Sequence, residues 1–395
     1  MINQLKKNYL VIFESIILAI LSFFLNFYIA AGLGPTQFGS LSLINTIIFT
    51  FLAVGSFVRK KPFLNKLKNY DINTLFPTLL LLNIFSSIIV SILLNIAIFI
   101  FKPEILIYTI IMSFIYLFNS ATFLSVYYIF NEEGNKASLF KIGSVTIGLV
   151  LRFLLIYYEV DFIYLILSYV IEFLFLFILI IINANLNIKK MKFNKFILIE
   201  HLKVGYHLVV EIMIGKVSNL IMILSVTKFL GLSFLGKLII AIRIQNVMGM
   251  LLVSIENVIY PHLIKIKDYK KTLMNAFKLY LIISLSLFIF IQIGLEPILM
   301  KFLKSDYNES IYIAKWLSIS LLFTPFEIYM RTIILIKEQM DIIKKMNIFT
   351  LIYSIPAALI LIPIYKEEGV IIFILGNSIL YMIMLSFLYQ KVNRT

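Results

Sequence analysis

The sequence predicts an all-α protein that crosses a lipid bilayer about twelve times, and three observations lead to this prediction. The 395 residues are 61% hydrophobic and only 14% charged, with a mean hydropathy of +1.01, far above the range of soluble proteins. Apolar runs of about 20 residues, the length that spans a bilayer as a helix, recur along the whole chain. A seven-residue motif near the N-terminus also returns 197 residues later.

The connectors between these runs are too short for a soluble domain. The first run follows Lys6 and Lys7 as a signal peptide would, but it is too long for the apolar part of one. We therefore expect it to be retained as the first of twelve spans. The spans are placed near residues 10–32, 37–58, 74–101, 105–130, 141–158, 162–183, 204–227, 233–262, 274–295, 311–336, 346–364 and 369–390.

The basic residues predict the orientation. With the connectors assigned alternately to the two sides, 24 of the 35 Lys and Arg residues fall on one side and six on the other. The positive-inside rule places the richer side, and with it both termini, in the cytoplasm. Loop lysines that set topology also account for the net charge of +15, so no nucleic-acid partner is expected.

The repeated motif divides the chain into two halves. Both copies read Leu-Gly-x-[Thr/Ser]-x-[Phe/Leu]-Gly, and both fall in a predicted outer connector after the first helix of a six-helix half. Because six is even, the halves share one orientation and are related by a pseudo-twofold axis along the membrane normal. We expect lobes at residues 1–190 and 191–395, with a basic cytoplasmic hinge at Asn183–Lys203. The copies are Leu33–Gly39 and Leu230–Gly236.

The chain resembles the Wzx-type oligosaccharide flippases. The resemblance rests on an N-terminal helix, the motif Leu33–Gly39, an apolar helix reaching Gly55, the basic stretch Arg59–Lys61 and twelve spans. These flippases belong to the superfamily that includes the MATE-type multidrug exporters and the lipid II flippases. The resemblance implies a MATE-like, V-shaped pair of lobes around a central cavity.

The same resemblance implies a function in the inner (cytoplasmic) membrane of a bacterium. Members move undecaprenyl-pyrophosphate-linked oligosaccharide units from the cytoplasmic to the periplasmic leaflet, for O-antigen (lipopolysaccharide) or capsule synthesis. A polysaccharide polymerase and a chain-length regulator are the implied partners. The resemblance brings no catalytic motif to align, so no family residue is carried over.

Charged residues at membrane depth are the candidates for chemistry, because burying them in lipid is costly and they usually face a cavity or a partner. Five spans carry none, and polarity is concentrated in the first, fifth, sixth, seventh, eighth and tenth. This pattern predicts a central water-filled lumen with apolar helices outside it. The candidates are Glu14, Arg152, Glu172, Glu211, Lys216, Arg243, Glu256, Glu327 and Arg331.

Arg243 is the preferred ligand for substrate phosphate. Only five arginines occur in the chain, and three of them lie inside spans, where a rigid, bidentate guanidinium suits a pyrophosphate or a fixed ion pair. Asn246 lies one turn further along the same helix and can bind sugar or phosphate. The alternative is a structural ion pair of Arg243 with Glu211 or with a residue of another helix. Arg152 and Lys216 complete the set of expected lumen residues.

The other charged residues leave two interpretations open. Arg152 and Glu172 lie at similar depth on adjacent helices, so they form either a structural salt bridge or part of the lumen. Glu327 and Arg331 are four residues apart and are expected to form a local structural pair. The buried carboxylates are the candidates for carrying a coupling ion or proton; they are Glu211, Glu256 and Glu172.

Several classes of protein are excluded or disfavoured. The chain has no cysteine and only three histidines, so no thiol chemistry or metal centre is expected. It has no phosphate-binding loop for ATP, no sign of a cofactor, and no large outer loop, so an enzyme is not expected. Two alternatives to a flippase remain: an ion-coupled multidrug antiporter of the same fold and, less favoured, a membrane polysaccharide polymerase.

Overall fold

The computed structural model of the chain is helical throughout. It describes residues 9–55, 58, 63, 70–131, 133–184, 191–263, 269–303, 305–337 and 340–394. Within these ranges every regular element is a helix and no strand occurs. The predicted all-α class is therefore confirmed.

The chain divides into two compact units. Unit 1 consists of Met1–Leu25 and Ile44–Met213, and unit 2 of Asn26–Leu43 and Ile214–Thr395. The helix that contains the first motif copy thus contributes to both units. The lobes expected at residues 1–190 and 191–395 were placed from the sequence repeat, whereas the two units are defined by contacts within the structure. The lobes stay a prediction.

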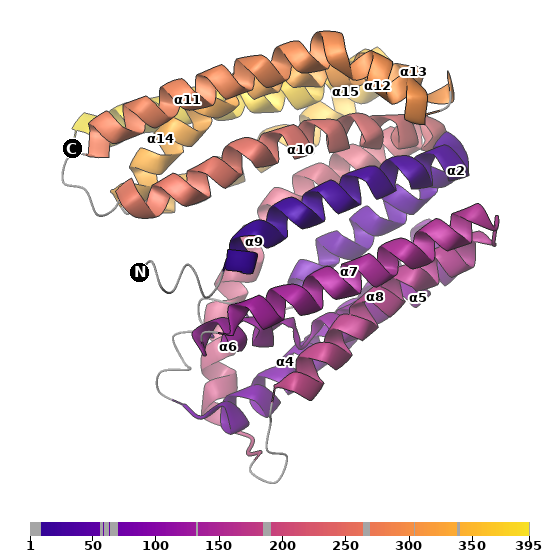
Figure 1. The fold of residues 1–395 in the computed structure, drawn as a ribbon, viewed down its shortest axis with the longest axis vertical. Helices are drawn as coiled ribbons and strands as arrows, with labels where there is room; N and C mark the ends of the chain where they lie inside the picture. The colour runs from indigo at the N-terminus through magenta and orange to yellow at the C-terminus, as the bar shows by residue number, and fades with distance from the viewer. Residues whose placement is uncertain are drawn as a thin grey trace. The chain divides into compact units, whose positions relative to one another are not determined.

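Unit 1 contains both ends of α2, the five helices α4, α5, α6, α7 and α8, and the first part of α9. In Figure 1, α5, α7 and α8 run side by side, and α8 packs against both of the others. A short 3-10 turn, η2, follows α5. The bounds are α2 Tyr9–Gly55, α4 Ile72–Phe101, α5 Leu106–Asn119, η2 Thr122–Leu124, α6 Ser125–Phe130, α7 Gly134–Tyr157, α8 Phe162–Asn183 and α9 Lys195–Phe229.

Unit 2 contains the remaining helices. A π-helical segment joins α11 to α12, and a 3-10 segment joins α13 to α14. The bounds are α10 Gly231–Leu263, α11 Tyr269–Ile289, η4 Phe290–Gly294, α12 Leu295–Phe302, α13 Asn308–Leu317, η6 Ser318–Leu322, α14 Thr324–Ile336 and α15 Met340–Arg394.

Ten segments of the described chain are long and apolar enough to cross a membrane. Two of the ten contain a sharp turn: α2 turns at Gly34 (φ 73°) and α15 at Lys366 (φ 51°). Each is therefore two helices joined end to end. The prediction of a polytopic all-α membrane protein is confirmed, with ten candidate spans in the described chain, two of which contain such a turn.

The repeated motif forms the same local structure twice. Its first glycine, Gly34 or Gly231, has a positive φ that favours glycine and lets the chain turn. The last glycine of each copy, Gly39 or Gly236, lies where α2 and α10 approach each other closely within unit 2. A Cβ atom on Gly39 would lie 1.9 Å from the backbone oxygen of Leu232, and one on Gly236 would lie 2.1 Å from that of Pro35. The two copies therefore pack against each other, backbone to backbone.

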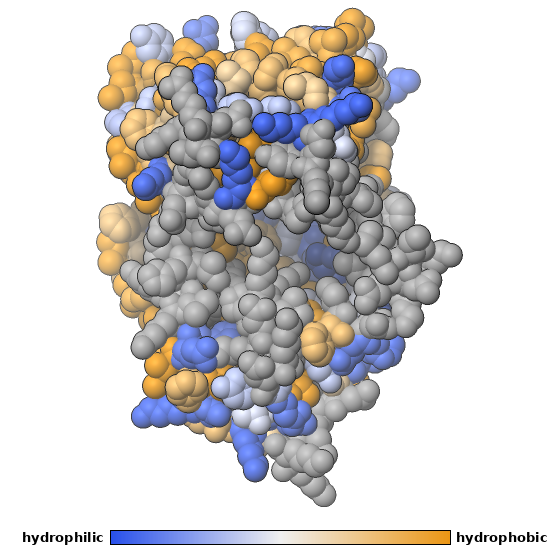
Figure 2. Space-filling view, turned by 90° about the vertical axis from the view of Figure 1, so that its left-hand side faces the viewer, coloured by the Kyte–Doolittle hydropathy of each residue, from blue (hydrophilic) through white to orange (hydrophobic). Residues whose placement is uncertain are grey.

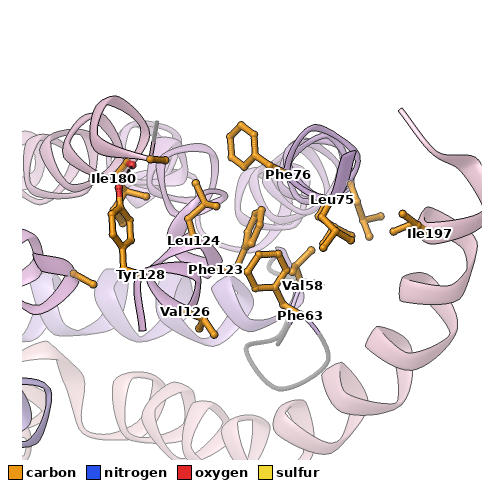
Figure 3. Packing of buried hydrophobic residues seen from close by; sticks show 14 residues of the cluster. Val58, Phe63, Leu75, Phe76, Phe123, Leu124, Val126, Tyr128, Ile180 and Ile197 are labelled. Atoms are coloured by element: carbon orange, nitrogen blue, oxygen red, sulfur yellow. Dashed lines mark hydrogen bonds between the residues drawn. The ribbon is translucent and has the colours of Figure 1, made fainter. Parts of the chain in front are cut away.

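A hydrophobic core holds unit 1 together. Figure 3 shows Phe123 of η2 with Phe63 and Phe76 beside it; their ring centroids lie 4.9 and 6.2 Å from that of Phe123. The buried Tyr128 hydroxyl donates a hydrogen bond of 2.9 Å to the backbone oxygen of Ile180. Because a buried phenol needs a polar partner, this bond ties α6 to the end of α8.

The surface has the character of a membrane protein. On α4, Phe85, Ile92 and Phe99 recur every seven residues and are each more than half exposed, at 67%, 54% and 64%. An exposed apolar stripe of this kind is typical of a helix that faces lipid. Figure 2 shows hydrophilic side chains among hydrophobic ones on the face that it draws.

Candidate functional site

A cavity of about 410 Å³ lies inside unit 1, between α2, the α5–α6 segment, α7 and α8. This volume is within the range of small-molecule sites, about 300–1,000 Å³. Its polar lining residues are Glu14, Asn119, Thr122, Ser125, Ser138, Lys141, Ser144 and Glu172. Its apolar lining residues are Ala137, Val145, Phe173, Leu176 and Ile180.

One wall of the cavity is a broken helix. The span expected at 105–130 is interrupted after Asn119, where the 3-10 turn η2 separates α5 from α6. Non-helical backbone at membrane depth is tolerated only where it is buried in protein or lines a cavity. Asn83 of α4 holds the break, because its amide donates to the backbone oxygen of Ser120 at 2.9 Å. The Asn83 side-chain oxygen accepts from the Val58 amide at 3.0 Å.

A carboxylate–lysine pair lies at the cavity wall formed by α2 and α7. Glu14 accepts a hydrogen bond of 2.8 Å from the buried Ser138 hydroxyl and an ion-paired one from Lys141. The Glu14 side chain is 15% exposed, whereas that of Lys141 is 48% exposed. We expected Glu14 at membrane depth, but Lys141 and Ser138 were not among the expected site residues.

The second pair is Arg152 and Glu172, which the sequence placed at similar depth. The Arg152 guanidinium donates to Glu172 and, at 3.2 Å, to the Ser168 hydroxyl. It also lies over the Tyr169 ring, with the guanidinium carbon 3.6 Å from the ring centroid. Arg152 itself is only 4% exposed, while Glu172 lines the cavity. The pair is therefore a salt bridge whose acidic member faces the cavity.

Gly148 makes room for this salt bridge. A Cβ atom on Gly148 would lie 2.5 Å from a carboxylate oxygen of Glu172 and 3.2 Å from a guanidinium nitrogen of Arg152. Glycine at this point of α7 thus allows α8 to approach closely enough for the two charges to meet.

The charges of the cavity balance. Each of the two lining carboxylates has its own cation: Lys141 for Glu14 and Arg152 for Glu172. The cavity therefore has many hydrogen-bonding groups and little net charge. Among the described residues, no group of three or more His, Cys, Asp and Glu side chains is placed to hold a metal ion.

The remaining expected site residues lie elsewhere in the chain. Arg243 and Asn246 are both exposed on α10 and, three residues apart, share one helix face. Lys216 is half-buried on α9. The side chain of Glu211 lies outside the described part of the chain.

Glu327 and Arg331, the expected local pair, both lie on α14 in unit 2. Within the described residues the two members of the expected pair do not form a direct salt bridge. Whether these residues act in transport stays a prediction.

Several cavity residues carried a signal that the sequence analysis did not use. The run Asn119-Ser120-Ala121-Thr122 is small and polar in the middle of an otherwise apolar span. Such residues compete with helical backbone bonds, so this run is compatible with a break in the helix. Ser138 and Ser144 gave no comparable signal, because single serines are common in membrane helices.

Solved structures of membrane transporters match this fold. The lipid II flippase MurJ, in an inward closed conformation, gives a TM-score of 0.73 at 17% identity, covering 95% of this chain and 86% of the flippase. An inward-facing multidrug resistance MATE family transporter of the MOP superfamily gives 0.63 at 14% identity, covering 95% and 96%. The chain therefore shares the fold of these two proteins.

A third solved structure also matches. A MOP superfamily transporter from Pyrococcus furiosus gives a TM-score of 0.58 at 15% identity, covering 99% of this chain and 95% of that one. No protein-family model matches the chain, and no curated protein sequence does either. At these identities the likeness establishes the fold alone, and the matched proteins are transporters or flippases rather than enzymes.

Proposed function

We propose that this MOP-fold protein is a flippase for undecaprenyl-pyrophosphate-linked oligosaccharide units. It would move them from the cytoplasmic to the periplasmic leaflet of a bacterial inner membrane, for O-antigen or capsule synthesis, and hand them to a polysaccharide polymerase and its chain-length regulator. The observation that carries the proposal is the similarity to the lipid II flippase, whose TM-score of 0.73 exceeds the 0.63 of the multidrug transporter.

Arg243 is the proposed ligand for the pyrophosphate. It is an exposed guanidinium within a segment of α10 that is apolar enough to cross a membrane. A charged group at that depth is costly in lipid, so it is expected to face an aqueous path. A guanidinium binds phosphate with two parallel hydrogen bonds, which a lysine cannot reproduce. Asn246 on the same face, and Lys216 on α9, would add polar contacts.

The alternative is an ion-coupled multidrug antiporter, as the matched MATE transporter is named. A drug cation needs an uncompensated carboxylate, and both carboxylates of the unit 1 cavity are paired with a cation. The cavity therefore favours the flippase. In either case the energy is proposed to come from an ion gradient, with Glu211, Glu256 and Glu172 as candidate ion carriers.

Transport by the purified protein in proteoliposomes tests the proposal. We expect wild-type protein to move a lipid-linked oligosaccharide analogue between leaflets, and the rate to fall at least tenfold in both Arg243→Ala and Arg243→Lys. The loss in the lysine variant follows from the missing second hydrogen bond. Lys237→Ala is the matched control, since Lys237 is a cation on the same helix that forms an ion pair with Glu309, whose side chain is half exposed.

Two results would contradict this assignment. Full transport by Arg243→Ala at normal protein levels would remove Arg243 from the site. Transport of an organic cation, driven by an imposed proton or sodium gradient and without movement of the lipid-linked analogue, would establish the antiporter instead.

The proposed orientation has a separate test, for which the absence of native cysteines is convenient. Single cysteines at Thr36, Ser233 and Asn308, which are exposed, are expected to react with an impermeant maleimide from outside the cell. Cysteines at Asn69, Asn194 and Asp268 are expected to react only after the membrane is opened. Asn69 and Asp268 lie outside the described residues. The reverse labelling pattern would show that the true topology is the inverse of the proposed one.

A further inference from the structure

We propose that the unit 1 cavity is a binding site for a neutral sugar unit. The inference rests on the proposed function, because it names the part of a lipid-linked oligosaccharide that the cavity would hold. It concerns a site separate from Arg243, which belongs to unit 2 and is assigned to the phosphate.

The first argument is the chemistry of the lining. A sugar offers hydroxyl groups that both donate and accept hydrogen bonds, so its site needs groups of both kinds. The Ser125 hydroxyl lines the cavity and has no hydrogen-bond partner among the described residues. Glu172 accepts through Oε2 alone within the same set, which leaves its Oε1 as an acceptor. Both groups are available to a ligand.

The second argument is charge. Glu14 and Glu172 are each matched by one cation, so the cavity offers neither an unpaired carboxylate for an organic cation nor an unpaired cation for a phosphate. Breaking either pair to bind a charged ligand would leave a charge uncompensated in a partly buried site, which is strongly unfavourable. A neutral, polyhydroxylated ligand makes its contacts without disturbing the pairs.

The third argument is the apolar part of the lining. The Phe173 ring lies in the lining together with Leu176 and Ile180 of the same helix, α8. One face of a sugar ring consists of C–H groups, which pack against aromatic and aliphatic side chains. A cavity lined by both hydrogen-bonding and apolar side chains fits a ligand with both kinds of surface.

The position of the cavity along its helices agrees with entry of the substrate from the cytoplasmic side. Ser138 and Lys141 lie in the first turns of α7, and Ile180 lies in the last turn of α8. In the proposed orientation these helix ends are cytoplasmic, which is the side on which a lipid-linked unit is presented before it is flipped.

Direct ligand binding to the purified full-length protein in lipid nanodiscs tests the inference. Saturation-transfer NMR with the neutral methyl glycosides of glucose, galactose and N-acetylglucosamine is expected to give a signal for at least one of them. Ser125→Leu fills the cavity and removes the open hydroxyl, so it should lower that signal at least fivefold. Val145→Phe fills the cavity from α7 and should do the same if the first variant fails to fold. Ser286→Ala is the control, because the Ser286 hydroxyl bonds only its own helix, to Ile282.

Competition separates the possible ligand classes. Inorganic pyrophosphate and rhodamine 6G should not displace the bound glycoside. Displacement by the cationic dye, or equal glycoside signals in the wild type and the two filled variants, would overturn the inference.

The same variants distinguish this inference from the proposed function. Glycoside binding without movement of the lipid-linked analogue in proteoliposomes would contradict the flippase and leave the sugar site standing. Movement of the analogue at the wild-type rate in Ser125→Leu and Val145→Phe, with no glycoside binding, would support the flippase and overturn the sugar site.

Discussion

Gly39→Ala and Gly236→Ala are each expected to destabilise the protein strongly, although alanine is the smallest possible addition. The new Cβ atom would lie 1.9 Å from the backbone oxygen of Leu232 in the first variant and 2.1 Å from that of Pro35 in the second. Both obstacles are backbone atoms, so no side chain can rotate away and α2 and α10 must separate. Overpacking of this kind typically costs about 1–3 kcal/mol, and valine should cost more than alanine.

Thermal unfolding of the purified protein measures this effect, and two other glycines supply matched controls. Gly143 and Gly215 are helical, and a Cβ atom on either would meet nothing within 4 Å. Alanine at these positions should be neutral or stabilising by up to about 1 kcal/mol, because glycine is a poor helix former. If Gly39→Ala proves as stable as Gly143→Ala, the close approach of the two motif copies is wrong.

Breaking the Arg152–Glu172 pair is the second substitution with a large expected effect. Arg152→Met leaves the Glu172 carboxylate beside the cavity without its cation, and it also removes the guanidinium from the Tyr169 ring and the Ser168 hydroxyl. Loss of one member of a buried pair typically costs about 3–5 kcal/mol. Glu172→Gln should cost a similar amount, because it leaves Arg152 buried and unpaired.

The double variant Arg152→Met/Glu172→Gln distinguishes a true pair from two independent contacts. It removes both charges, so its free energy of unfolding should be clearly higher than the sum of the two single losses predicts. Lys136→Ala is the control: Lys136 pairs with Glu133 at the surface, with side chains 58% and 43% exposed, and such pairs contribute about 0–1 kcal/mol. Additive losses, or an Arg152→Met loss no larger than that of Lys136→Ala, would contradict the assignment.

The membrane spans could be predicted from the sequence because each depends on local hydrophobicity. A run of about 20 apolar residues has one stable form in a bilayer, a helix whose backbone bonds are all internal. Local hydrophobicity also predicted the two turns inside α2 and α15. The turns lie at Gly34 and Lys366, within the gaps that separate the predicted spans at residues 33–36 and 365–368.

The break in the fourth span was harder to predict from the sequence. Its local signal is the polar run from Asn119 to Thr122, but such a run is equally compatible with an intact helix. The break is stable because Asn83, on another helix, satisfies the carbonyl of Ser120. Hydropathy along a single span contains no information about such a partner.

The candidate site, too, could be predicted from the sequence only in part. Charged residues at membrane depth could be selected from the sequence, and Arg152 with Glu172 was expected at one depth. The cavity also depends on Ser125, Ser138 and Lys141, which come from helices whose relative rotation no local pattern specifies.

The sequence by itself determined the class of this protein, its spans and its internal repeat, because hydrophobicity and the motif are properties of the chain alone. Tertiary structure decided that the two motif copies touch through Gly39 and Gly236, and that Glu14 meets Lys141. These contacts join residues about 200 and 127 positions apart. They exist only because whole helices pack at particular rotations and depths, which are set by the combined fit of many side chains.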